Sequence, residues 1–331
     1  MDGESVGQFV ISLDFEIMWG VRDKVTPTTY GENLLGVQEV IPKTLALFNK
    51  FGIEATFATV GLLFFRNKKE MLSNLPRHIP SYSNKILSPY GNYLDRQVGE
   101  DAAVDPYHFA PHLVQTIKSA PNQEIGTHTF SHYYCLEEGQ TVDDFREDLK
   151  AAIAIAKKRD IEITSMVFPR NQFNEDYLQV CKECGILVVR NNQNSWLYKV
   201  TPGNGNEIVR KISRLMDNYI NLTGYHCYSS QSLLSSFPIR LPGSRFLRPY
   251  TSRLRLLESI RMKRIKNEMT YAAKNKLIYH LWWHPHNFGT NQDKNFKFLE
   301  EILLHYRDLN KRYGFNSITM TNLAKKLLNK E

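Results

Sequence analysis

Hydrophobic positions along this chain fall into two alternating patterns. Short runs rich in Val, Ile, Phe and Thr predict β-strands at residues 8–15, 53–61, 123–130, 163–169, 186–190, 276–283 and 316–320. Apolar residues at helical spacing predict helices between these strands, at residues 37–51, 142–159, 174–184, 262–272 and 296–313, and a last helix at the end of the sequence. This alternation predicts an α/β protein with a parallel sheet, either open or closed into a barrel.

One domain is expected to span residues 1–331, because no repeat, low-complexity linker or change of composition divides the sequence. The stretch at about 64–123 is too long for an ordinary connection between two strands. We therefore expect an insertion with some helix after the second strand, in the position of a lid.

The formal net charge of +8 is concentrated in one basic helical segment at about 245–276. This segment holds ten Lys and Arg against Glu258 and Glu268, and ten minus two equals the excess of the whole chain. It predicts peripheral contact with an anionic membrane or with a phosphate-bearing substrate, and the alternative is a solvated helix face. No recognised nucleic-acid-binding motif accompanies it, so no nucleic acid partner is expected.

The location is predicted from two further features of the sequence. Its first residues lack the basic and apolar regions of a signal peptide, and the longest apolar run, 55–65, is too short to span a bilayer. Four cysteines in 331 residues do not make a disulfide framework. We expect a cytoplasmic protein, placed at the inner membrane surface if the basic segment contacts lipid.

Two carboxylates follow the first predicted strand, which ends in SLDFE. Asp14 and Glu16 are two positions apart, so on an extended chain they share a face while Phe15 points to the other. Two like charges on one face are unfavourable unless a cation or an arginine lies between them. A single Asp in this position commonly caps the next element, but the pair favours a functional site.

Two histidines, His128 and His132, follow the third predicted strand in the stretch IGTHTFSH. The same spacing occurs at His108 and His112, where Pro111 looks like the first residue of a helix, and at His280 and His284. Such a pair is more often structural than metal-binding. Only His128 and His132 have a pair of carboxylates at an equivalent strand end, so they are the candidate ligands.

Two later strand ends carry further polar residues. Arg170 in VFPRNQF can lie beside a carboxylate and keep it ionised, although alone it would indicate a surface salt bridge. The strand before LWWHPHNFG ends at His284, because Pro285 terminates it, and His284 is a candidate general acid. Trp283 and His286 are the candidate substrate-binding residues.

In this order, the motifs together resemble the polysaccharide deacetylase family, the nodulation-protein-B-type carbohydrate esterases of family 4. The resemblance runs from Asp14 to His286. It implies a distorted (β/α)7-like barrel and metal-dependent hydrolysis of an N-acyl group on a sugar. Asp14 matches the family's general base, Arg170 the residue that steadies this base, and His284 the general acid.

The same resemblance implies a metal site and shows where this chain departs from the pattern. His128 and His132 match metal ligands, but Phe15 stands where most members have a third ligand, an Asp. We expect Glu16 to replace it, in a site that suits Zn²⁺ and also accepts Co²⁺ or Ni²⁺. The family's acidic residue before a tryptophan is also missing, since only amides precede Trp196 nearby.

The predicted function is removal of an acetyl or formyl group from an N-acylated sugar, lipid- or phosphate-linked, in the biosynthesis of envelope polysaccharide or glycolipid. One alternative is an amidohydrolase of the same fold that acts on a small non-sugar amide. The other is a catalytically silent glycan-binding protein, which the altered first and fourth motifs would suit.

Overall fold

A computed structural model describes residues 6–193, 195, 197 and 213–329. Its centre is a parallel sheet in the order β6-β5-β4-β3-β2-β1-β8-β7, with β9 paired to β1. The strands are β1 (Gln8–Phe15), β2 (Ala55–Thr59), β3 (Gln123–Thr127), β4 (Ser165–Val167), β5 (Val188–Asn191), β6 (Ile239–Pro242), β7 (Arg245–Phe246), β8 (Ile278–Trp283) and β9 (Asn316–Ser317). All seven predicted strands are present, with ends that differ by a few residues.

The sheet curls back on itself because its two edge strands are consecutive in the chain. Only Gly243 and Ser244 separate β6 from β7. The amide of Gly243 donates to the carbonyl of Asn191 on β5 at 2.9 Å, and the amide of Ser244 donates to the carbonyl of His280 on β8 at 2.8 Å. One extended segment therefore pairs with both edges, and the predicted distorted barrel is confirmed.

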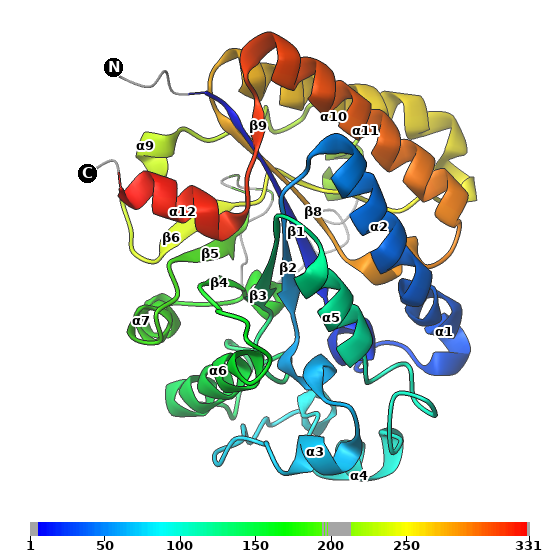
Figure 1. The fold of residues 1–331 in the computed structure, drawn as a ribbon, viewed down its shortest axis with the longest axis vertical. Coiled ribbons are helices and arrows are strands. Elements are labelled where there is room, and N and C mark those ends of the chain that lie inside the picture. The colour runs from blue at the N-terminus through cyan, green and yellow to red at the C-terminus, as the bar shows by residue number, and fades with distance from the viewer. Residues whose placement is uncertain (1–5, 194, 196, 198–212, 330–331) are drawn as a thin grey trace.

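Helices cover the outside of the curled sheet (Figure 1). The α-helices are α1 (Pro27–Leu35), α2 (Val37–Phe51), α3 (Lys68–Leu72), α4 (Asn92–Gln97), α5 (Pro111–Ser119), α6 (Val142–Lys157), α7 (Glu175–Glu183), α9 (Ser230–Leu233), α10 (Glu258–Lys274), α11 (Gln292–Tyr313) and α12 (Met320–Leu328). Short 3₁₀ helices are η1 (Ile17–Gly20), η2 (Gly61–Phe64), η3 (Lys85–Leu87), η4 (Pro169–Asn171), η5 (Ser252–Leu257) and η6 (Pro285–Phe288). No helix in the described part of the chain combines the length and apolarity needed to cross a membrane.

Local sequence explains where the longer helices begin and end. The Thr141 hydroxyl and the Asp144 carboxylate form a capping box at the start of α6, which satisfies backbone amides that have no partner within the helix. Phe145, Leu149 and Ala152 lie on the buried face of α6 at helical spacing. A left-handed Gly52, with φ of 64°, ends α2.

Strand β1 decides which side chains enter the barrel. All eight of its residues are buried, as expected for a parallel strand covered on both faces. Phe9, Leu13 and Phe15 belong to the outer core beneath the helices, whereas Val10 packs with α12 in a second core inside the barrel. Because side chains alternate, the next inward position after Val10 and Ser12 is Asp14.

The expected insertion after β2 contains η2, α3, η3, α4 and α5. Helix α5 contacts both β3 and α2, as an ordinary crossover helix would, so the extra chain lies before Pro111. This part packs behind the barrel mouth: the Tyr82 hydroxyl accepts the amide of Tyr134 at 2.9 Å, and Arg22 donates to the carbonyl of Leu87. None of its described residues lines the pocket presented below.

Candidate metal centre and active-site pocket

The carboxyl ends of the strands surround a pocket of about 500 Å³. Residues from β1, β5, β7 and β8 and from the loops after β1, β3, β4, β5 and β8 line it, together with one from the segment after residue 212. The charged and aromatic members are Asp14, Glu16, Lys24, His128, His132, Arg170, Arg190, Arg214, Phe246, Trp282, His284 and His286. Seven of the eight predicted site residues are therefore in one place.

Glu16, His128 and His132 converge at the floor of this pocket. One oxygen of Glu16, Oε2, lies 3.2 Å from Nε2 of His128 and 3.0 Å from Nε2 of His132. All three residues are buried, and one ligand atom from each lies within 4.8 Å of the others. Phe15 lies in the core, so Glu16 is the carboxylate that joins the two histidines.

The residues around this triad fit a metal ion. Nδ1 of His128 donates to the carbonyl of Val167 at 2.8 Å, so the lone pair of a neutral ring is on Nε2, which faces Glu16. Burial lowers the pKa of His132 to about 4, so its ring is neutral at physiological pH. A Cβ on Gly20 would lie 1.9 Å from the carboxyl carbon of Glu16, so the absence of a side chain there makes room for the carboxylate.

Both histidines belong to a tightly held turn after β3. Thr129 and His132 have positive φ angles of 64° and 59°, a conformation that costs energy for residues other than glycine. The fully buried carboxylate of Asp148, on α6, accepts from the amides of Phe130 and Ser131 at 2.7 and 3.2 Å and from the Ser131 hydroxyl. These bonds hold the strained turn that presents the two rings.

Arg190, on β5, holds Asp14. Its two terminal nitrogens each lie 2.6 Å from a different oxygen of the Asp14 carboxylate, and its guanidinium lies 4.0 Å from the centre of the Trp282 ring. Burial of Asp14 opposes ionisation, but Arg190, with His128 and His284, outweighs it and keeps the pKa of Asp14 below its usual value. The site therefore holds an ionised, buried carboxylate beside the candidate metal ligands.

The predicted pairing of Arg170 with Asp14 is wrong. Arg170 lines the pocket, but it binds Asp23 at 2.5 Å and Glu137 at 2.9 Å. The chain after β4 turns sharply, since Arg170 has a φ of 55°, and this directs its side chain toward the rim. Arg190 occupies the position that the sequence assigned to Arg170.

His284 is at the end of β8, as predicted, and faces both carboxylates. Its Nε2 lies 3.6 Å from Oδ2 of Asp14 and 3.6 Å from Oε1 of Glu16. His286 stacks on it with ring centres 5.1 Å apart, and burial, helped by His284, lowers the pKa of His286 to about 3. His280 is a core residue as expected, with its Nε2 2.8 Å from the Ser12 hydroxyl.

The prediction that Trp283 contacts substrate is wrong. Its side chain is fully buried against Phe48 and Phe288 on the helix-facing side of β8. Trp282 points the other way, into the pocket, where its ring packs on Phe246 with centres 4.7 Å apart. Trp196 lies outside the described residues.

Two pocket residues that were not predicted, Arg190 and Trp282, could have been identified from their positions on predicted strands. Arg190 is the last residue of the predicted strand 186–190, so it occupies a strand end like Asp14 and His284. Trp282 is two positions before His284 and shares its face. For Lys24, which lies in a turn, and Arg214, which lies in the helical stretch 213–217, no local pattern marks a role in the pocket.

Comparison with known proteins agrees with this architecture. A family model described as polysaccharide deacetylase matches residues 22–189, which is more than half of the chain. The match includes His128 and His132, whereas Asp14, Glu16, Arg190 and His284 lie outside it. No curated protein matches the sequence.

Several solved structures share the fold at low sequence identity. A protein from Mycobacterium smegmatis titled a polysaccharide deacetylase aligns with a TM-score of 0.59 and 11% identity, covering 100% of this chain and 93% of its own. A protein from Pseudomonas aeruginosa PAO1, also described as a polysaccharide deacetylase, aligns with a TM-score of 0.54 and 9% identity, covering 98% of this chain and 90% of its own. An allantoinase aligns with a TM-score of 0.53 and 10% identity, covering 96% of this chain and 88% of its own. The matched family model and this shared barrel together show that the chain belongs to the polysaccharide deacetylase family.

Proposed function

We propose that this protein is a divalent-metal-dependent hydrolase that removes an N-acyl group, acetyl or formyl, from an amino sugar. The observation that carries the proposal is the convergence of Glu16, His128 and His132 beside the ion pair of Asp14 and Arg190, in one pocket. A carboxylate and two imidazoles form a donor set of the kind found in catalytic zinc sites, which leave positions open for water and substrate.

Glu16, His128 and His132 are the residues that would hold the ion. Nitrogen and oxygen donors of this kind suit Zn²⁺ and also accept Co²⁺ or Ni²⁺. A divalent ion at this position supplies Lewis acidity, which polarises an amide carbonyl and lowers the pKa of water.

The proton transfers fall to two side chains beside the triad, Asp14 and His284. Asp14 is the general base, since Arg190 keeps it ionised and fixes the direction of its oxygens. His284 is the general acid that delivers a proton to the departing amine, which is otherwise a very poor leaving group. His286 is unsuited to this role, because with a pKa near 3 its ring is neutral at physiological pH. We assign it to substrate contact.

The pocket walls support a sugar substrate with an anionic substituent. Trp282 and Phe246 provide an aromatic surface for a sugar ring, and Lys24 and Arg214 add positive charge to the lining. We propose a phosphate- or lipid-linked amino sugar, an intermediate of envelope polysaccharide or glycolipid biosynthesis in the cytoplasm. The same metal chemistry would also hydrolyse a small non-sugar amide, so this alternative enters the test.

The test measures release of acetate and formate from a panel of N-acyl sugars, sugar phosphates and small amides. We expect turnover of at least one N-acyl sugar, loss of turnover with a chelator, and recovery on addition of Zn²⁺, Co²⁺ or Ni²⁺. Turnover of small amides alone would favour the alternative amidohydrolase. Sugar binding without release of either acid would favour a glycan-binding protein.

The roles within the site are tested with Asp14→Asn. This variant should lose turnover but bind Zn²⁺ within a few-fold of the parent, because the base is not a ligand. Loss of the metal together with activity would show that Asp14 coordinates the ion and that the roles are wrong.

A further inference from the structure

The basic residues of segment 245–276 divide into two groups in the structure. Arg245, Arg261 and Arg264 are buried, although the sequence suggested that all ten Lys and Arg contribute to a charged surface. Exposed are Arg253, Arg255, Lys263, Lys274 and Lys276, while Arg248 and Lys266 are partly exposed and belong to neither group. The two groups have different roles.

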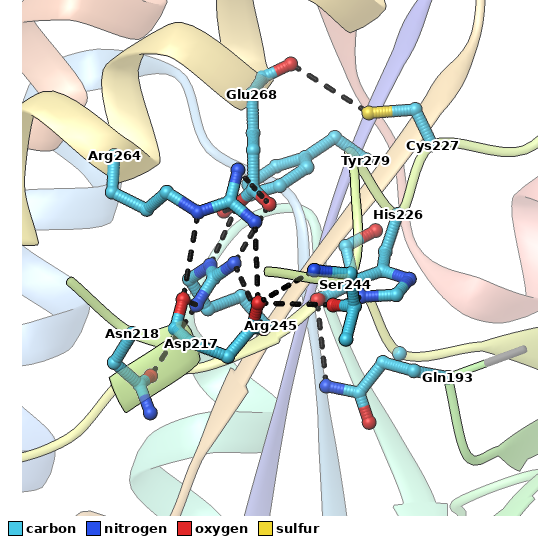
Figure 2. Close-up of polar contacts among 12 residues, drawn as sticks. Gln193, Asp217, Asn218, His226, Cys227, Ser244, Arg245, Arg264, Glu268 and Tyr279 are labelled. Atoms are coloured by element: carbon cyan, nitrogen blue, oxygen red, sulfur yellow. Dashed lines mark hydrogen bonds and ion pairs between the residues drawn. The ribbon is translucent and has the colours of Figure 1, made fainter. Parts of the chain in front are cut away.

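Two of the buried arginines, Arg245 and Arg264, form an interior ion-pair network with Asp217 and Glu268 (Figure 2). Arg245 donates to both oxygens of Glu268 at 2.6 and 2.7 Å, and Arg264 lies 3.1 Å from Glu268 and 3.7 Å from Asp217. Arg264 also donates to the carbonyl of Gly224 at 2.8 Å. The network joins α10 to β7 and holds the segment 216–225 against α10.

The exposed group has no exposed acidic counterpart on its own segment. Between residues 213 and 276 the sequence contains three carboxylates, Asp217, Glu258 and Glu268. Asp217 and Glu268 are fully buried in the network, and Glu258 is half-buried and paired with Arg261. The network therefore removes the negative charges from this face and leaves positive ones.

Apolar side chains lie on the same face. Leu256 is 83% exposed, and Ile260, one turn later on α10, is also exposed. Ile220 and Leu222, with exposed fractions of 54% and 50%, extend the patch along the neighbouring segment. Exposed apolar patches commonly mark sites of contact with a protein or a membrane.

Contacts between α10 and the segment 216–225 show that this is one surface. The rings of Tyr225 and Tyr271, both partly exposed, lie 5.1 Å apart, and Arg264 reaches the carbonyl of Gly224. The surface also adjoins the pocket, because the chain leads from Phe246 in the pocket wall through residues 247–251 to η5.

We propose that the exposed face of η5 and α10, with residues 216–225, is a docking surface for an anionic membrane. Cations attract the lipid headgroups, while Leu256, Ile260, Ile220 and Leu222 enter the interface between headgroups and acyl chains. Docking in this way brings the barrel mouth near the bilayer. The proposal concerns the location of the protein and does not depend on the proposed reaction.

The test is cosedimentation with vesicles of phosphatidylglycerol and phosphatidylcholine, compared with phosphatidylcholine alone. The parent protein should bind the anionic vesicles at least tenfold more tightly, and this preference should shrink in 0.5 M salt. The double variant Arg253→Glu, Arg255→Glu should weaken binding at least about 30-fold, since each basic residue near an anionic surface contributes about 1 kcal/mol and the new carboxylates are repelled as well. The double variant Leu256→Ser, Ile260→Ser should weaken binding to anionic vesicles severalfold, both at low salt and in 0.5 M salt.

The matched control is Lys69→Glu with Lys157→Glu, which makes the same change in net charge at exposed positions on α3 and α6. These helices lie far from α10 in Figure 1. The control should bind vesicles within about twofold of the parent. Equal losses in both double variants, equal binding to neutral and anionic vesicles, or a dimer that Arg253→Glu, Arg255→Glu converts to monomer would each overturn the proposal.

Discussion

Replacing Arg190 by Met tests which arginine serves Asp14. The substitution removes both 2.6 Å bonds to the carboxylate, the contact with the Ser12 hydroxyl at 3.2 Å and the packing over Trp282. The carboxylate of Asp14, which is only 2% exposed, is then left without its cation. Removing one partner of a buried ion pair costs about 3–5 kcal/mol. The unfolding entropy of a 331-residue chain is roughly 0.7 kcal/mol per degree, so the melting temperature should fall by about 4–7 °C.

The same substitution should also reduce catalysis. Without the guanidinium, burial favours the protonated form of Asp14, which cannot act as a base. We expect kcat/KM to fall by a factor on the order of 10² to 10⁴ while Zn²⁺ binding changes only a few-fold. Arg190→Lys should be intermediate, because it keeps the charge but loses the two-pronged geometry.

Arg170→Met is the matched control. Arg170 is partly exposed and binds Asp23 and Glu137 at the rim, so its loss should cost at most about 1 kcal/mol and less than tenfold in kcat/KM. Thermal melts and initial rates on the same substrate, with bound metal measured in each sample, decide the comparison. A larger loss of activity from Arg170→Met than from Arg190→Met, with both proteins folded, would refute the assignment.

Three further predictions concern neighbouring residues. Gly20→Ala places a Cβ 1.9 Å from the carboxyl carbon of Glu16, so Zn²⁺ affinity should fall at least tenfold by calorimetry, and unchanged affinity would contradict the proposed ligand set. His284→Ala should lower kcat by a factor on the order of 10² to 10⁴, and a greater loss in His286→Ala would move the general acid to that residue. Burial raises the pKa of Asp148 to about 7, so folding favours its protonated form, and its contribution to the free energy of unfolding falls as pH rises from about 4 to 7. Asp148→Asn should therefore reduce the dependence of the free energy of unfolding on pH, measured by denaturant titration. An unchanged pH dependence would contradict the assignment to Asp148.

Local sequence was sufficient for most of the pocket and for seven of the nine strands in the described part of the chain, but it did not predict β6 and β7. Apolar runs with period 2 and period 3.6 determine which segments become strands and helices, because each must bury one face or stripe. Parallel strands bring their carboxyl ends to one edge, so the polar residues at these ends predict a common site for Asp14, His128 and His284, and all three line the pocket. Glu16 shares a strand face with Asp14, and its expected role as a ligand came from the family resemblance, because Phe15 stands where most members have the third ligand.

Pairing between side chains was decided only by the tertiary structure. In the sheet order, β5 is separated from β1 by β4, β3 and β2, so Arg190 reaches Asp14 across the interior of the curled sheet. Nothing local distinguishes Arg190 from Arg170, whose left-handed backbone turns it to the rim. The burial of three arginines in the basic segment could not be predicted from local sequence either. Composition counts charges, but only packing decides whether a guanidinium faces a buried carboxylate, as Arg245 faces Glu268, or water.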